Sequence, residues 1–117
     1  MGRIRTVKPE LFTHEGLYEL EKACKLPVRL AFIGLFTACD RLGRFRWEPN
    51  RLKLAILPYD KKLDFDAVLA ALASGRFVFK YVEHGQGYGC IPSWRQHQII
   101  GTREKRSDIP EPPCICT

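Results

Sequence analysis

The sequence lacks a long apolar run and an apolar leader segment. Its longest apolar stretch, residues 30–39, is too short to span a bilayer. Residues 1–10 are basic and polar, which is unlike a secretory signal. We therefore expect a cytoplasmic protein with no membrane partner.

Catalytic motifs are also missing. The sequence has no phosphate-binding glycine loop, no nucleophile elbow and no zinc-protease motif, and its three histidines lie in separate segments. Asp60, Asp64 and Asp66 lie close together but have the pattern of a turn and a helix cap, not of a metal-binding carboxylate cluster. We predict that the protein is not an enzyme and needs no cofactor.

The five cysteines do not predict a disulfide framework, because their number is odd and no secretory signal precedes them. Cys24, Cys39 and Cys90 lie among apolar residues, where a free thiol acts as a small hydrophobic group. Cys114 and Cys116 form a C-x-C, but a structural zinc site normally needs a second ligand pair. We therefore predict no metal site and assign no role to Cys114 and Cys116.

Positive charge is concentrated in the middle of the chain. The net charge of the 117 residues is +6. Residues 25–63 contain nine basic and three acidic residues, whereas basic and acidic residues balance on either side. A basic region of this kind is typical of proteins that bind polyanions, so nucleic acid is an expected partner.

The first half of the chain predicts two helices and a short strand. Apolar residues at helical spacing indicate a helix over 9–23 and a longer, nearly all-apolar helix over 27–41. The second of these is expected to be central and buried, with Gly43 at its end. Alternation over residues 43–47 then predicts a brief strand.

Two further helices and a hairpin follow. A helix begins at residues 49–50, and Asp64 is placed to cap a helix over 65–74. The expected buried face of this last helix consists of Phe65, Val68, Leu69 and Leu72. Strands over 77–83 and 88–92 flank a loop at 84–87, and the aromatic residues Phe77, Phe79 and Tyr81 are expected to face the core.

This order predicts an α+β fold, a winged helix-turn-helix: helix, long helix, short strand, two helices and a two-stranded wing. The short strand is expected to pair with the wing in one antiparallel sheet. The length suits one domain, which we place at residues 1–100. The proline-rich segment 101–117 is expected to be an exposed, flexible tail.

Four groups of residues carry a resemblance to a known family. They are G-R-I-R-T-V-K-P-E (2–10) with F-T-H-E-G-L-Y-E-L-E (12–21), L-P-V-R-L-A-F-I-G-L-F-T-A-C-D-R-L-G-R-F-R-W (26–47), L-K-L-A-I-L-P-Y-D (52–60) and Y-G-C-I-P-S-W-R-Q-H-Q (88–98). Together they resemble the N-terminal winged-helix domain of phage replication-initiation, or replisome-organiser, proteins. The resemblance implies a winged-helix fold and a role in phage DNA replication inside a bacterial host cell.

Polar residues that flank the fourth helix, on the wing and in the last segment, are the predicted contacts to duplex or single-stranded DNA. Such residues position a protein on phosphates without reading sequence. The predicted DNA-binding residues are Arg51, Lys61, Lys62, Arg76, Lys80, His84, Gln86, Arg95, Arg103, Lys105 and Arg106.

The outward face of the fourth helix supports an alternative. Its residues Asp66, Ala67, Ala70 and Ala73 are small or acidic, whereas readout of bases normally uses Arg, Lys, Asn or Gln. In this alternative the same fold docks or blocks a replication protein, such as a helicase or its loader, through helix 65–74. A homodimer formed by the wing or the first helix is a third hypothesis.

Overall fold

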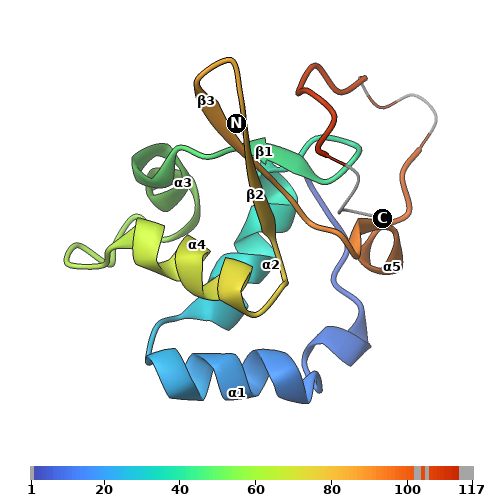
Figure 1. Ribbon diagram of the computed structural model, residues 1–117. Coiled ribbons are helices and arrows are strands. Elements are labelled where there is room, and N and C mark those ends of the chain that lie inside the picture. Colours follow the sequence, from blue (N-terminus) through green and yellow to red (C-terminus); the bar gives the residue numbers. More distant parts are fainter. Residues whose placement is uncertain (1, 102–103, 105, 114–117) are drawn as a thin grey trace.

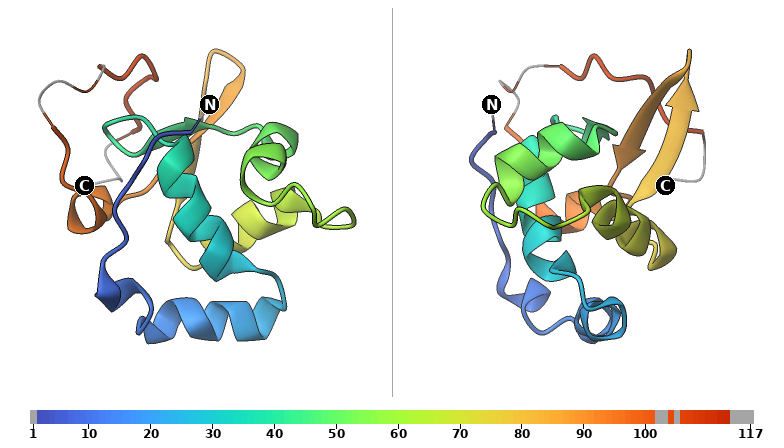
Figure 2. Two further views of the ribbon diagram at one scale, coloured as in Figure 1. Left: turned by 180° about the vertical axis from the view of Figure 1, so that it is seen from behind. Right: turned by 90° about the vertical axis from the view of Figure 1, so that its left-hand side faces the viewer.

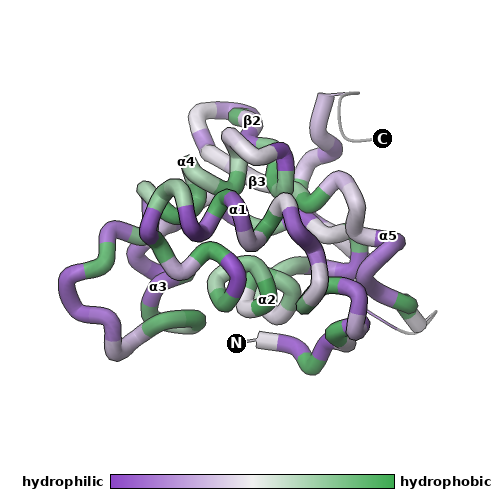
Figure 3. Tube along the Cα trace, turned by 90° about the horizontal axis from the view of Figure 1, so that it is seen from below, coloured by the Kyte–Doolittle hydropathy of each residue, from purple (hydrophilic) through white to green (hydrophobic). Residues whose placement is uncertain are grey.

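Helix α2, Val28–Ala38, is the element around which the others pack. The computed structural model, which describes residues 2–101, 104 and 106–113, shows α2 in contact with helices α1, α3 and α4 (Figure 1). Its residues Ala31, Phe32, Leu35 and Phe36 are almost completely buried. The prediction of a central buried helix is confirmed, although Leu30 is 56% exposed. The predicted end was wrong, because α2 stops at Ala38 and is capped by Cys39, before residue 41 and Gly43. Figure 3 shows α2 as a largely hydrophobic segment.

The expected helix over 9–23 is divided in two. A short 3-10 turn, η1, covers Pro9–Leu11, and α1 covers Glu15–Cys24. The break arises because His14 has an extended backbone and caps α1, its Nδ1 accepting a hydrogen bond of 3.1 Å from the amide of Leu17. The prediction of one continuous helix was wrong at this point.

Helices α3, Pro49–Ile56, and α4, Phe65–Ser74, pack against each other. The bounds of α4 are those predicted. The Asp64 carboxylate accepts hydrogen bonds from the amides of Asp66 and Ala67, as expected of an N-cap. The four residues expected on the buried face of α4 are at most 2% exposed.

The three strands form one antiparallel sheet, as predicted. Strands β1, Arg44–Arg46, β2, Phe79–Glu83, and β3, Gln86–Cys90, lie in the order β1-β3-β2. The turn between β2 and β3 has only two residues, His84 and Gly85, both with positive φ, the geometry of a tight hairpin turn. The predicted loop over 84–87 was too long, since Gln86 pairs with Glu83.

The two faces of the sheet are covered by different parts of the chain. Phe45 packs into the main core across Gly89, where an added Cβ would lie 2.4 Å from the Phe45 ring. On the reverse face Tyr81, Tyr88 and Cys90 form a second cluster, packed with Phe79 and Ile109. The expectation that Phe79 and Tyr81 face the core was therefore wrong, because the C-terminal segment supplies a separate cover.

Helix α5, Trp94–His97, follows β3, and the described residues after it fold back onto the protein. The predicted tail starts at residue 101, yet Ser107 donates to the Asp40 carboxylate and the Tyr81 hydroxyl donates to the Pro110 carbonyl at 2.8 Å. Figure 2 shows this segment running past the sheet. Part of the predicted tail thus contributes to packing.

Cysteine, metal and membrane expectations can be compared with the residues that the structure describes. Cys24 and Cys39 carry free thiols, whereas Cys90 is disulfide-bonded, so the expectation of a free thiol was wrong for Cys90. Residues 114–117 lie outside the described residues. Within the described ranges no three His, Cys, Asp or Glu side chains gather as metal ligands, and no helix has the length and apolar character needed to cross a bilayer.

Candidate nucleic-acid interface

Trp47 joins helix α4 to the hairpin of β2 and β3. Its indole Nε1 donates to Asp66 Oδ1 at 3.3 Å, and its backbone amide donates to the Gly87 carbonyl at 2.9 Å. Lys80 Nζ lies 4.9 Å from the centre of the Trp47 ring. The exposed residues Ala70 and Val82 follow Asp66 and Lys80 at helix and strand spacing, respectively. We call Trp47, Asp66, Ala70, Lys80 and Val82 the helix–hairpin surface.

Of the two DNA-binding residues predicted at the hairpin tip, the structure places one in the turn and the other in a strand. His84 is exposed in the turn, with a φ of 51°. Gln86 is half-buried in β3, and its Nε2 donates to the Gly87 carbonyl at 2.9 Å. Because the turn is shorter than predicted, Gln86 belongs to the strand and not to the tip.

Three predicted cations border α3 and α4. Arg51 is exposed in the first turn of α3, and Lys61 and Lys62 are exposed in the turn that precedes α4. None of the three forms an ion pair with another residue in the described part of the chain. Their charges are therefore available to an external anion.

The remaining predicted contacts lie elsewhere. Arg76 is at the end of α4 opposite to Lys61 and Lys62, about 15 Å away by the length of a ten-residue helix, beside α1 and α5. Arg95 lies in α5 and Arg106 in the C-terminal segment, on the other side of the sheet from α3 in Figure 1. Arg103 and Lys105 lie outside the described residues. The structure does not gather these residues at the helix–hairpin surface.

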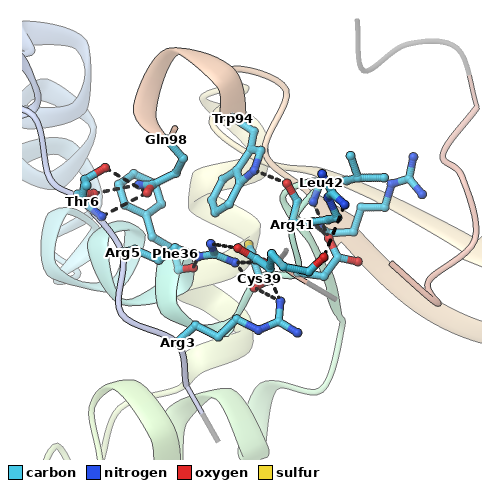
Figure 4. Close-up of polar contacts among 12 residues, drawn as sticks. Arg3, Arg5, Thr6, Phe36, Cys39, Arg41, Leu42, Trp94 and Gln98 are labelled. Atoms are coloured by element: carbon cyan, nitrogen blue, oxygen red, sulfur yellow. Dashed lines mark hydrogen bonds and ion pairs between the residues drawn. The ribbon is translucent and has the colours of Figure 1, made fainter. Parts of the chain in front are cut away.

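Two arginines near the N-terminus have a role that the sequence did not predict (Figure 4). The Arg5 side chain is 5% exposed, and its Nη1 and Nη2 donate to the two Glu104 carboxylate oxygens at 2.7 Å each. Arg5 also donates to the carbonyls of Phe36 and Cys39, and Arg3 donates to Cys39 and Glu104. These side chains donate hydrogen bonds to carbonyls at the C-terminal end of α2, where the last carbonyls of a helix lack partners within it and positive charge is favourable.

The same contacts influence ionisation. The hydrogen bond from Arg5 lowers the pKa of the Glu104 carboxyl, and the same hydrogen bond raises the pKa of Arg5. Arg5 also lies over the Trp94 ring, 5.1 Å from its centre. The Arg5–Glu104 pair is thus held between α2 and α5 and is charged at neutral pH.

Thr6 and Gln98 hold the N-terminal segment to the end of α5. The Thr6 amide donates to Gln98 Oε1 at 3.0 Å, and Gln98 Nε2 donates to the Thr6 carbonyl at 2.7 Å. The Trp94 indole donates to the Arg41 carbonyl at 2.8 Å, as Figure 4 shows. Residues 3–6 and 94–98 therefore act as structural partners.

Ser93 and His97 form a hydroxyl–imidazole pair, with Ser93 Oγ 2.9 Å from His97 Nε2. Burial lowers the pKa of His97, and its ring packs against Phe32 and Phe36. Within the described residues no carboxylate is hydrogen-bonded to this imidazole, so the third group of a hydrolytic triad is not found there. The pair is explained by packing at the end of the core.

Comparison with protein-family models, with curated proteins and with solved structures finds no match to this chain.

Proposed function

We propose that the chain is a winged helix-turn-helix, a non-catalytic DNA-binding module that acts in phage DNA replication. The order α2, β1, α3, α4, β2, β3 supports this fold, with α3 and α4 as the helix-turn-helix and β2–β3 as the wing. The resemblance to phage replication-initiation proteins supports the biological role.

The observation that carries the proposal is the placement of cations without ion-pair partners around the helix–hairpin surface. Lys61 and Lys62 lie at one border, in the turn before α4, and Lys80 lies on the wing. Asp66 is the only carboxylate among the residues of this surface, and it accepts a hydrogen bond from the Trp47 indole. Contacts to phosphates through lysines position a protein on DNA without reading its sequence.

The test is affinity for a duplex oligonucleotide across a series of salt concentrations. The wild-type protein should bind with a log–log slope of about −0.9 per phosphate neutralised, and replacing Lys61 and Lys62 together by Ala should flatten the slope by up to about two. The control is Lys22→Ala with Lys25→Asn, which removes two exposed charges from the region of α1. The proposal would be refuted if the affinity did not change with salt concentration, or if the two double variants had equal log–log slopes.

A second candidate function is docking of a replication protein, such as a helicase or its loader. The observation that favours it is the exposure of two large apolar side chains beside the same helices, Leu54 at 69% and Tyr59 at 89%. Apolar side chains on the turn and on the outer face of α3 suit a protein partner better than a phosphate backbone. Replacing both by Ser should abolish capture of that partner and leave the salt slope for DNA unchanged.

A further inference from the structure

A pocket of about 270 Å³ lies between the N-terminal segment, the end of α2, β1 and the start of α3. None of the residues of the helix–hairpin surface lines it. Four arginine residues do: Arg3, Arg44, Arg46 and Arg51. The volume is below the range of sites for drug-sized ligands, so the pocket suits a small ionic group.

The free edge of β1 adds a backbone donor to this pocket. Strand β1 is an outer strand of the sheet. The Gly43 carbonyl accepts from the amide of Ile91, directly after β3, and the Trp47 amide donates to the Gly87 carbonyl in β3. The amides of Arg44 and Arg46 consequently point away from the sheet. The Arg44 amide donates to Asp40 Oδ1 at 3.1 Å, whereas the Arg46 amide has no hydrogen-bond partner in the described part of the chain.

The carboxylates that line the pocket do not neutralise it. Asp40 Oδ1 accepts from the amides of Leu42 and Arg44, and its Oδ2 accepts from the Ser107 hydroxyl. Glu48 is the second carboxylate in the wall. Asp40 is thus already occupied by three donors. Of the four arginines in the wall, Arg3 pairs with Glu104, and Arg44, Arg46 and Arg51 form no ion pair among the described residues.

Arginine residues in the wall of the pocket retain guanidinium donors that no described residue uses. Arg51 is exposed and has no acceptor among the described residues. Arg46 has no hydrogen-bond acceptor there either, and its guanidinium lies 5.9 Å from the centre of the Tyr88 ring. Arg44 uses Nη1 to donate to the Ile109 carbonyl at 3.1 Å. Guanidinium groups and a backbone amide together match the several acceptor oxygens of a phosphate.

We propose that this pocket binds a phosphate monoester group. A terminal phosphate, carried by a free nucleotide or by the end of a nucleic-acid strand, presents three oxygens and enters a small concavity. A phosphate inside a duplex is flanked by two sugars and does not enter it. This proposal goes beyond duplex binding at the helix–hairpin surface. If the bound phosphate is the end of a nucleic-acid strand, the proposal rests on the proposed DNA-binding function; if it belongs to a free nucleotide, it does not.

The experiment follows the amide resonance of Arg46 by NMR at constant ionic strength. The probes are inorganic phosphate, dAMP, and a single-stranded hexanucleotide with either a phosphate or a hydroxyl at its 5′ end. We expect a saturable shift of the Arg46 amide, and a dissociation constant at least about tenfold larger in Arg51→Gln, since a hydrogen bond to a charged group is lost. Arg51 is exposed, so this variant is expected to fold.

Lys22→Gln, which removes one exposed charge from α1, is the matched control and should bind every probe like the wild type. Tighter binding of the hexanucleotide with a 5′ phosphate than of the one with a 5′ hydroxyl would show that the pocket binds the phosphorylated end of a strand. Equal binding of the two strands, with saturable binding of phosphate and dAMP, would assign it to free phosphate compounds. An unmoved Arg46 amide, or wild-type affinity in Arg51→Gln, would overturn the proposal.

The Lys61, Lys62 double variant separates the two proposals. It should lose salt-dependent duplex affinity and keep phosphate binding in the pocket, because neither lysine lines it. If phosphate does not bind in the pocket, the salt-dependent affinity for duplex DNA is still expected. If duplex DNA does not bind, the phosphate-induced shift of the Arg46 amide is still expected.

Discussion

The N-terminal segment and the helix–hairpin surface both carry basic residues, but the two groups differ in what they contact. Arg3 and Arg5 are bonded to Glu104 and to carbonyls at the end of α2. Lys61 and Lys62 project into solvent with no ion-pair partner among the described residues. The comparison shows that positive charge in a sequence marks a binding surface only where the fold leaves it unoccupied.

The largest expected effect that tests this contrast is on stability. Arg5→Gln removes one partner of a mostly buried ion pair and leaves Glu104 with only the more exposed Arg3, so unfolding in urea should be easier by about 1–3 kcal/mol. Arg95→Gln, at an exposed position of α5, should change stability by less than about 0.5 kcal/mol. Equal losses in the two variants would remove the distinction between structural and available arginines.

A smaller effect is expected in the pH dependence of stability. Because the hydrogen bond from Arg5 lowers the pKa of Glu104 in the folded state, the stability that this pair contributes is complete above the ordinary carboxyl pKa of about 4.3. It is lost as the pH falls through the lower folded-state value. Urea denaturation between about pH 5 and pH 2 should show a flatter pH dependence in Glu104→Gln than in the wild type. An unchanged profile would mean that the pair does not stabilise the fold.

The smallest expected effect concerns Asp66. Asp66→Asn retains a side-chain oxygen for the Trp47 indole and removes one negative charge from the helix–hairpin surface. Affinity for duplex DNA should stay constant or rise by no more than about fivefold, since an exposed charge interacts with a phosphate by about 1 kcal/mol or less in water.

The same variant distinguishes the two candidate functions. If α4 docks a protein through its acidic face, Asp66→Asn should weaken binding of that protein and leave DNA binding unaffected. A strong loss of DNA affinity with the fold intact would show instead that the carboxylate accepts a hydrogen bond from a base. Sequence-blind phosphate binding would then be wrong.

The sequence predicted α4 closely because its signals are local. Asp64 caps the helix, and the apolar residues that follow it recur at helical spacing. The pairing of β1 with the hairpin was predicted from the order of the elements and is confirmed.

The N-terminal contacts had no local signal. Arg5 and Glu104 are separated by 99 positions, and charge counting placed them in segments of balanced charge. The alternation of β2 likewise distinguished two faces of a strand, but it did not show that Ile109 covers the face of Tyr81. Which residue an arginine pairs with, and which face of a strand is covered, depends on segments far away in the sequence. The periodicity of a single sequence does not identify these segments.

The two-residue turn at His84 and Gly85 has a consequence for how the hairpin tolerates change in its length. Successive residues of β2 serve opposite purposes, since Lys80 lies over Trp47 while Tyr81 packs beneath the C-terminal segment. One residue inserted within β2 would exchange these neighbours, sending a phenol towards α4 and a charged amine beneath Ile109. Viable length changes are therefore expected in steps of two residues, or at the turn itself, where His84→Gly would relax an unfavourable backbone and keep both faces in place.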